Sequence, residues 1–233
     1  SLMIGFAVGL PPLWDIENGK SRIGVFGLMD QGSNNGRGLI PSPPDPWSRI
    51  HAGWEQPVDI HLNSQINIPK RSENNIFKVD INENEYFLIE NRNNHFKTGI
   101  SIDSARFKVY QDADEYPSFI EVLIDSVPLK IDDNGVIVGL SNYDLGLPGA
   151  GLLIWHIDEQ LIDAGISTYE INKYVDNMGV DLEESDGAQD IGNDSFFPFY
   201  DPSSGYFGDM WFFENPEYFR ANPQNEGSLP SFT

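Results

Sequence analysis

The sequence has no cysteine, few basic residues and no long apolar run. Without cysteine the chain can form neither disulfides nor cysteine-ligated zinc sites, and it has no thiol nucleophile. No stretch approaches the roughly 20 apolar residues that a membrane-spanning helix needs, so we do not expect membrane insertion. The opening residues also lack the charged region that precedes the apolar region of a signal peptide, so no signal peptide is expected in this chain.

Basic residues are scarce relative to acidic ones. Lys and Arg together number 14 against 36 Asp and Glu, which gives a formal net charge of −22. Such a chain repels phosphate backbones and anionic lipids, so we expect no binding to nucleic acid. Dense carboxylates supply the oxygen ligands that calcium prefers, although a solvated acidic surface is the more common explanation of such a charge. At 233 residues the chain can form one sizeable domain, or two small ones that share a core.

Short apolar segments separated by turn signals predict an α+β fold that is predominantly β, with few short helices. A helix is expected to end before Pro11, and a second one to begin after Asp45 as its N-cap, with Trp47, Ile50 and Trp54 facing the core. Residues 15–46 should be irregular, and "DEQLIDAG" should be a two-turn helix. Strands are predicted at "YFLIEN", "ARFKVYQ", "SFIEVLI", "VPLKI", "GVIVGL" and "GLLIWHI", with a hairpin turn at Asn134–Gly135.

Six short motifs follow one another in a distinctive order: "GFAVGLPPLWD", "GLMDQGS", "PWSRIHAGW", "YFLIENR", "PGAGLLIWHID" and "VDLEESDG". In this order they resemble the immune inhibitor A family of secreted bacterial metallopeptidases, which is metzincin-like, over most of residues 3–192. The resemblance implies a remnant of a metallopeptidase catalytic subdomain at 1–56 and a β-rich domain with an acidic loop and an aromatic tail at 57–233. It also implies an extracellular or periplasmic location.

The family pattern at the active-site helix resembles "HEFGHALGLPDLYD", and this chain departs from it at the positions that carry the chemistry. Leu2 and Phe6 stand where the family has histidine ligands, Met3 where it has the catalytic glutamate, and Pro12 where it has the third ligand. Met29 matches the methionine turn that lies under the metal. Zinc needs nitrogen, oxygen or sulfur donors, and a thioether cannot accept a proton from zinc-bound water. We therefore expect no zinc and no catalysis.

Two further groups of residues are candidates for binding. The segment from 176 to 190 is dense in acidic residues with glycines for turns, and a calcium-organised loop is one interpretation of it, level with a solvated acidic loop. The calcium candidates in it are Asp181, Glu183, Glu184 and Asp186. His156 and Asp158 alternate along a predicted strand and should share a face, although such a histidine is more often structural. The aromatic tail is expected to cover the core, with a stacking platform for sugars or peptides as the alternative.

The sequence thus predicts a secreted, catalytically inactive, zinc-less homologue of a zinc metallopeptidase. Its function would be that of a binding or scaffold module for a protein or peptide partner, with calcium bound at acidic loops. Two alternatives stay open. The chain can be a portion of an active metallopeptidase whose zinc ligands lie upstream, or a calcium-dependent carbohydrate or adhesion module on the same scaffold.

Overall fold

The structure is a computed structural model that describes residues 1–38, 40–61, 65–69, 75–97, 100–101, 129–140, 142–193, 202–213 and 215–221. The predicted strands "ARFKVYQ" and "SFIEVLI" lie outside these residues. In the described ranges no helix has both the length and the apolar character needed to cross a membrane.

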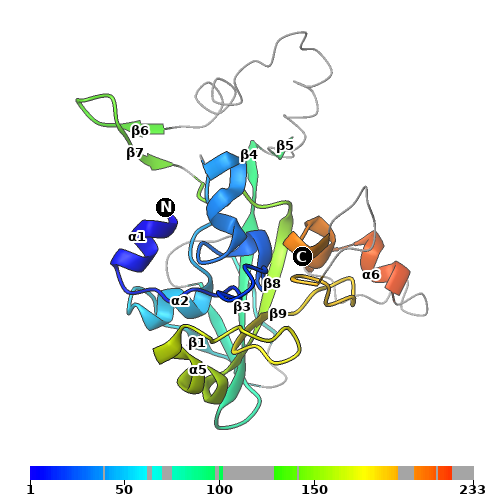
Figure 1. The fold of residues 1–233 in the computed structure, drawn as a ribbon. Coiled ribbons are helices and arrows are strands. Elements are labelled where there is room, and N and C mark those ends of the chain that lie inside the picture. The colour runs from blue at the N-terminus through cyan, green and yellow to red at the C-terminus, as the bar shows by residue number, and fades with distance from the viewer. Residues whose placement is uncertain are drawn as a thin grey trace.

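A five-stranded mixed sheet forms the centre of the fold (Figure 1). Its strands, in spatial order, are β1 (Val58–Asp59), β2 (Phe77–Asp80), β3 (Glu85–Asn93), β8 (Ala150–Asp158) and β9 (Val180–Leu182). β1 is parallel to β2, and the other neighbours are antiparallel. The longest pairing joins β3 and β8, in which all nine residues of each strand have a partner. β9 lies inside the segment that the sequence predicted as acidic loop.

Two hairpins and several short helices complete the described structure. The hairpins are β4 (His95–Lys97) with β5 (Ile100–Ser101), and β6 (Leu129–Ile131) with β7 (Ile137–Leu140). The predicted turn at Asn134–Gly135 joins β6 to β7, and Gly135 has the positive φ of 79° that favours glycine there. The helices are α1 (Leu2–Ala7), α2 (Pro46–His51), α5 (Glu159–Gly165) and α6 (Pro216–Ala221).

Short 3₁₀ helices occupy part of the segment predicted as irregular. They are η1 (Gly24–Phe26) and η2 (Gln31–Gly38), followed later in the chain by η3 (Ile166–Thr168), η4 (Pro202–Ser204) and η5 (Phe207–Asp209). More described residues lie in strands than in α-helices, and the helices are short. These features confirm a mixed α+β fold with few short helices.

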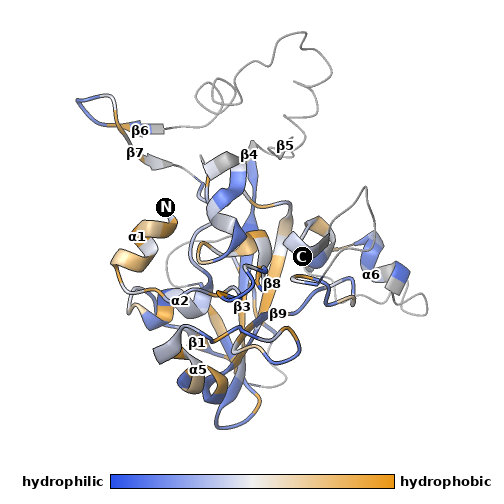
Figure 2. Cartoon of the chain, in the orientation of Figure 1, coloured by the Kyte–Doolittle hydropathy of each residue, from blue (hydrophilic) through white to orange (hydrophobic). Residues whose placement is uncertain are grey.

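The hydrophobic core lies against one face of the sheet. Strand residues that alternate along β3, β8 and β9 point into it and are fully buried, namely Leu88, Leu153, Trp155, Ile157, Val180 and Leu182. The segments before the sheet pack over them with Leu10, Leu13, Ile23, Phe26, Met29 and Trp47. Figure 2 shows apolar residues concentrated along β8 and in α1. Residues on both sides of position 56 therefore share one core.

The two predicted N-terminal helices form, but the second ends before Trp54, and this residue, which was predicted to face the core, is exposed. Asp45 caps α2 by accepting a hydrogen bond from the backbone N–H of Ser48 at 2.9 Å, and Trp47 is buried. The helix ends at His51, and Gly53 turns the chain with a φ of 71°. Trp54 consequently leaves the helical face and is 52% exposed, so the prediction that it faces the core is wrong.

Candidate functional site

Three carboxylates from two distant parts of the sequence converge beside β9. Glu184 and Asp186 follow the strand directly, and Asp209 ends η5. Each offers a carboxylate oxygen, and these oxygens all lie within 4.8 Å of one another. Asp209 is completely buried and Glu184 is 6% exposed. Within the described ranges this is the one group of three or more histidine, aspartate or glutamate residues close enough to share an ion. We call it the acidic cluster.

Backbone and hydroxyl donors hold two of the three carboxylates in place. The two oxygens of Glu184 accept hydrogen bonds from the backbone N–H groups of Asp190 and Ile191, at 3.0 and 3.1 Å. The loop after β9 is therefore folded back on this side chain. Asp186 accepts a hydrogen bond of 2.7 Å from the hydroxyl of Tyr206, which links the loop to the segment that carries Asp209.

Asp209 is only half satisfied by the protein. Its Oδ2 accepts a 2.7 Å hydrogen bond from the backbone N–H of Tyr206. Its Oδ1 is buried and has no hydrogen-bond partner among the described residues. A buried acceptor without a donor is costly, and a buried carboxylate oxygen more so. This oxygen therefore needs a proton or a cation.

The pKa shifts in the cluster also indicate that its carboxylates need protons or a cation. Burial raises the pKa of the Asp209 carboxyl to about 8, although the Tyr206 N–H lowers it, and the charges of Asp186 and Asp190 raise it further. Burial is also the main cause that raises the pKa of Glu184, with added repulsion from Asp209 and Asp190. The cluster consists of mutually repelling acids taken out of water, and a divalent cation would remove both the repulsion and the unmet acceptor.

The donors of the acidic cluster fit a hard cation. All three are carboxylates, which are the ligands of calcium and magnesium rather than of the softer transition metals. Calcium tolerates irregular arrangements of six to eight oxygens, so three side chains can hold it with water completing the shell. The acidic cluster can therefore hold a metal ion such as calcium.

The structure divides the four sequence-predicted calcium candidates between two places. Glu184 and Asp186 belong to the acidic cluster. Asp181 lies on β9 directly opposite His156 of β8, on the sheet face away from the core. Glu183 is the first residue after β9 and is also outside the acidic cluster. Burial, with the charge of Glu183 as a second cause, raises the pKa of Asp181 to about 7.

Sequence reasoning missed Asp209, the most buried member of the cluster. The signal available for it was its context, "YFGDMW", in a tail that was expected to cover the core. An acid among core-covering aromatic residues is expected to be buried, and a buried acid requires a partner. That partner could not be named, because Glu184 and Asp186 are distant in sequence.

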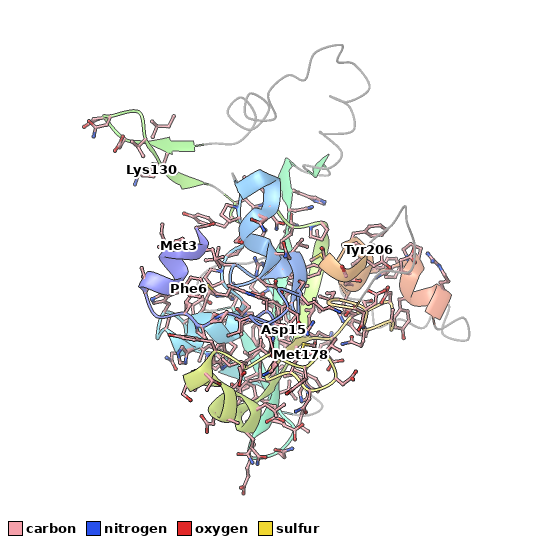
Figure 3. All side chains as sticks on the ribbon, viewed as in Figure 1. Met3, Phe6, Asp15, Lys130, Met178 and Tyr206 are labelled. Carbon is pink, nitrogen blue, oxygen red and sulfur yellow. The ribbon has the colours of Figure 1, made fainter. Side chains whose placement is uncertain are left out.

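Met3 and Phe6, which stand at zinc-site positions of the family that the sequence resembles, lie far from the acidic cluster (Figure 3). Met3 and Phe6 lie on α1, on the opposite side of the molecule from Tyr206. Met3 is 76% exposed, and Phe6 makes an edge-on contact with the ring of Trp14, with 5.8 Å between centroids. Pro12 is buried beyond the end of the helix.

Met29 is packed beneath α1. Its sulfur lies against Gly5, where a side chain larger than hydrogen would collide with it, and its carbonyl accepts a 3.0 Å hydrogen bond from the N–H of Leu13. The side chains at Leu2, Phe6 and Pro12 nevertheless carry no lone pair for a metal. The residues present at α1 therefore do not fit a zinc ion.

His156 and Asp158 occupy two separate local roles on β8. His156 Nε2 lies 3.2 Å from Glu85 Oε2, and its ring packs against Phe87 at 5.5 Å between centroids. Asp158 caps α5, accepting hydrogen bonds from the N–H groups of Gln160 and Leu161. Both side chains lie on the face of the sheet away from the core, as their spacing predicted.

Comparison with known proteins gives no relative for this chain. No family model matches it, and no curated protein or solved structure matches it.

Proposed function

We propose that this chain is a non-catalytic binding module of metallopeptidase-like ancestry that binds calcium at the acidic cluster. The observation that carries the proposal is Asp209, which is fully buried beside Glu184 and Asp186 and has one oxygen without a hydrogen-bond partner in the described part of the chain. A calcium ion there would tie the loop after β9 to η5. The ion would add to hydrogen bonds that already join these segments, such as Tyr206–Asp186 and the 3.0 Å bond from the N–H of Ser185 to the carbonyl of Asp209.

The absence of donor atoms at α1 supports the non-catalytic part of the proposal. A peptidase that activates water on zinc needs three protein ligands and a general base, and Phe6, Pro12 and Met3 supply neither. The contact between Met29 and Gly5 is what a methionine turn under an active-site helix would make, and it supports the proposed ancestry. An extracellular setting, which the resemblance implies, would also suit a calcium site of modest affinity, about 10⁻⁴ to 10⁻³ M.

Thermal unfolding with and without calcium tests the cation site. After treatment with a chelator, calcium at 100 times its dissociation constant should stabilise the protein by about 2.7 kcal/mol. That corresponds to a rise in Tm of about 5 to 10 °C for a chain of this length. Magnesium should give a smaller rise, since it dehydrates reluctantly and requires octahedral geometry.

Matched variants locate the effect. Glu184→Gln combined with Asp209→Asn should abolish the calcium-induced rise, whereas Asp163→Asn, at an exposed position of α5, should keep it. Equal rises in the double variant and the control would refute the site. Stoichiometric zinc in the purified protein, with chelator-sensitive cleavage of casein, would refute the non-catalytic assignment.

A further inference from the structure

The sheet face that points away from the core carries an open groove of about 880 Å³. Its apolar lining includes Ile68, Ile89, Leu152, Ile154, Trp211 and Phe212. Toward β3 it is bounded by the segment of Ile68, whose carbonyl accepts a 2.8 Å hydrogen bond from the side chain of Asn91. Toward β9 it is bounded by Trp211, whose backbone pairs with Leu152 through two hydrogen bonds of 2.8 and 3.0 Å. The groove therefore has aliphatic side chains in its floor and Trp211 along one wall, and polar side chains such as Asn91 and Asn93 complete its lining.

The same face becomes acidic two residues beyond the groove. Ile89 pairs with Ile154 in the floor, and two positions along the strands His156 lies between Phe87 and Asp181. Because side chains alternate along a strand, both rows lie on one face, about 6.8 Å apart. Glu183 lies beside Ile154, to whose carbonyl its N–H donates a 2.9 Å hydrogen bond, and adds a second negative charge close enough to Asp181 to raise the pKa of that carboxyl.

The acids at this end have no basic partner within the described part of the chain. None of the ion pairs there includes Asp181 or Glu183. Arg92 borders the groove but is fully buried, and it is already paired with Glu90 and Asp144. His156 lies in this row but is engaged with Glu85 at 3.2 Å. Among the described residues an anionic ligand would therefore meet carboxylates and no cation without a partner, whereas a cationic ligand would meet complementary charge.

We propose that this outer face binds an extended peptide segment with an apolar residue and a Lys or Arg separated by one residue. The proposal deepens the proposed function and rests on it for the premise that the chain is a binding module. The apolar side chain enters the floor between Ile89, Leu152 and Ile154. In an extended peptide the side chain two positions along lies on the same side at about 6.8 Å, which brings the basic group to Asp181 and Glu183.

The groove suits an aliphatic side chain better than a sugar ring. Sugars stack flat on exposed aromatic faces, but the floor here is aliphatic. The ring of Trp211 already packs against Tyr218 at 5.8 Å, and its Nε1 donates a 2.9 Å hydrogen bond to the carbonyl of Glu183. Trp211 therefore forms the groove wall with its orientation fixed, and not as a free stacking platform.

Fluorescence anisotropy with labelled pentapeptides tests the proposal. The probes are Thr-Ile-Thr-Lys-Thr, its charge-reversed form with Glu for Lys, and its truncated form with Ala for Ile. The first should bind at least fivefold more tightly than either of the others, and its affinity should fall with added salt. Asp181→Asn with Glu183→Gln should remove the preference for Lys over Glu, and Ile154→Ala should remove the preference for Ile over Ala. Asp163→Asn should change neither preference.

The same samples are titrated with calcium while Tm is recorded, which separates this inference from the proposed cation site. A calcium-induced rise in Tm without peptide binding would overturn the inference alone, and peptide binding without a rise would overturn the cation site alone. Equal binding of the Lys and Glu peptides, or binding to an oligosaccharide that displaces the peptide, would also overturn the inference. Circular dichroism confirms that each variant is folded.

Discussion

Asp30 and Asp209 are both buried carboxylates, but the protein neutralises them in different ways. Asp30 Oδ2 accepts hydrogen bonds from the backbone N–H groups of residues 22, 23 and 24 and from the hydroxyl of Ser21, at 2.7 to 3.1 Å. Among the residues that the structure describes, Asp209 accepts one hydrogen bond, from the backbone N–H of Tyr206, and the acids Asp186 and Asp190 lie close enough to raise the pKa of its carboxyl. Burial raises the pKa of both. A buried acid in this protein is thus structural where donors surround it, and a ligand candidate where they are missing.

The largest expected effect separates these two roles. Asp30→Ala leaves three buried N–H groups and a hydroxyl without their acceptor, and should lower the free energy of unfolding by about 3 to 5 kcal/mol with or without calcium. Asp209→Ala should cost little in chelator, since it removes a carboxylate with an unmet oxygen, but should abolish stabilisation by calcium. Chemical denaturation in chelator and in calcium measures both.

If the Asp30→Ala protein does not fold, a more conservative variant at the same position still allows the comparison. Asp30→Asn keeps one acceptor oxygen for the same donors, so it should be destabilised less and still respond to calcium. The comparison fails if Asp30→Asn loses the calcium response while Asp209→Ala keeps it.

The next effect is a dependence of stability on pH that calcium reduces. The folded-state pKa values of Asp181 and Asp209 are raised to about 7 and about 8, and that of Glu184 is also raised. Between about pH 5 and 8 the metal-free folded state therefore holds more protons than the unfolded state, whose carboxyls titrate near pH 4. Stability must fall as pH rises, by up to about 1.4 kcal/mol per pH unit for each group.

Saturating calcium removes the cluster's part of this dependence, because it binds the deprotonated carboxylates and leaves the folded state with no extra protons to lose. Denaturation at pH 5, 6, 7 and 8 should show falling stability in chelator and a calcium increment that grows with pH. In Glu184→Gln with Asp209→Asn, the slope in chelator should shrink, leaving the contribution of Asp181 and of other buried acids whose pKa is raised, such as Asp30 and Asp45. A rise in metal-free stability across this range would contradict the assignment of the buried acids.

Local chemistry explains which elements the sequence could predict. Asp45 as a cap and Gly135 in its turn act through neighbouring residues, so their roles could be derived from a few letters of sequence. The exposure of Trp54 could not be predicted in this way, because it depends on where α2 ends. β9 could not either, since three residues inside an acidic stretch form a strand only because Val180 and Leu182 fill the core beside β8.

The same distinction applies to the candidate site. Glu184 and Asp186 could be predicted as ligand candidates because acids are dense around them in the sequence. Asp209 joins them only through tertiary structure, since the Tyr206–Asp186 hydrogen bond and η5 bring it there. The separation of Asp181 from the cluster also depends on the sheet, which turns this side chain toward His156.

The smallest expected effect is at α1. Phe6 cannot hold a metal and is a 38% exposed ring with an edge contact to Trp14, so its replacement should matter little. We expect Phe6→Ala to lower the free energy of unfolding by about 1 kcal/mol or less, and to leave calcium and peptide binding unchanged. Leu13→Ala is the control, since that residue is fully buried nearby and should cost about 2 to 5 kcal/mol. Denaturant midpoints measure both, and a loss at Phe6 as large as that at Leu13 would mean that α1 makes contacts beyond those with Trp14 and the core.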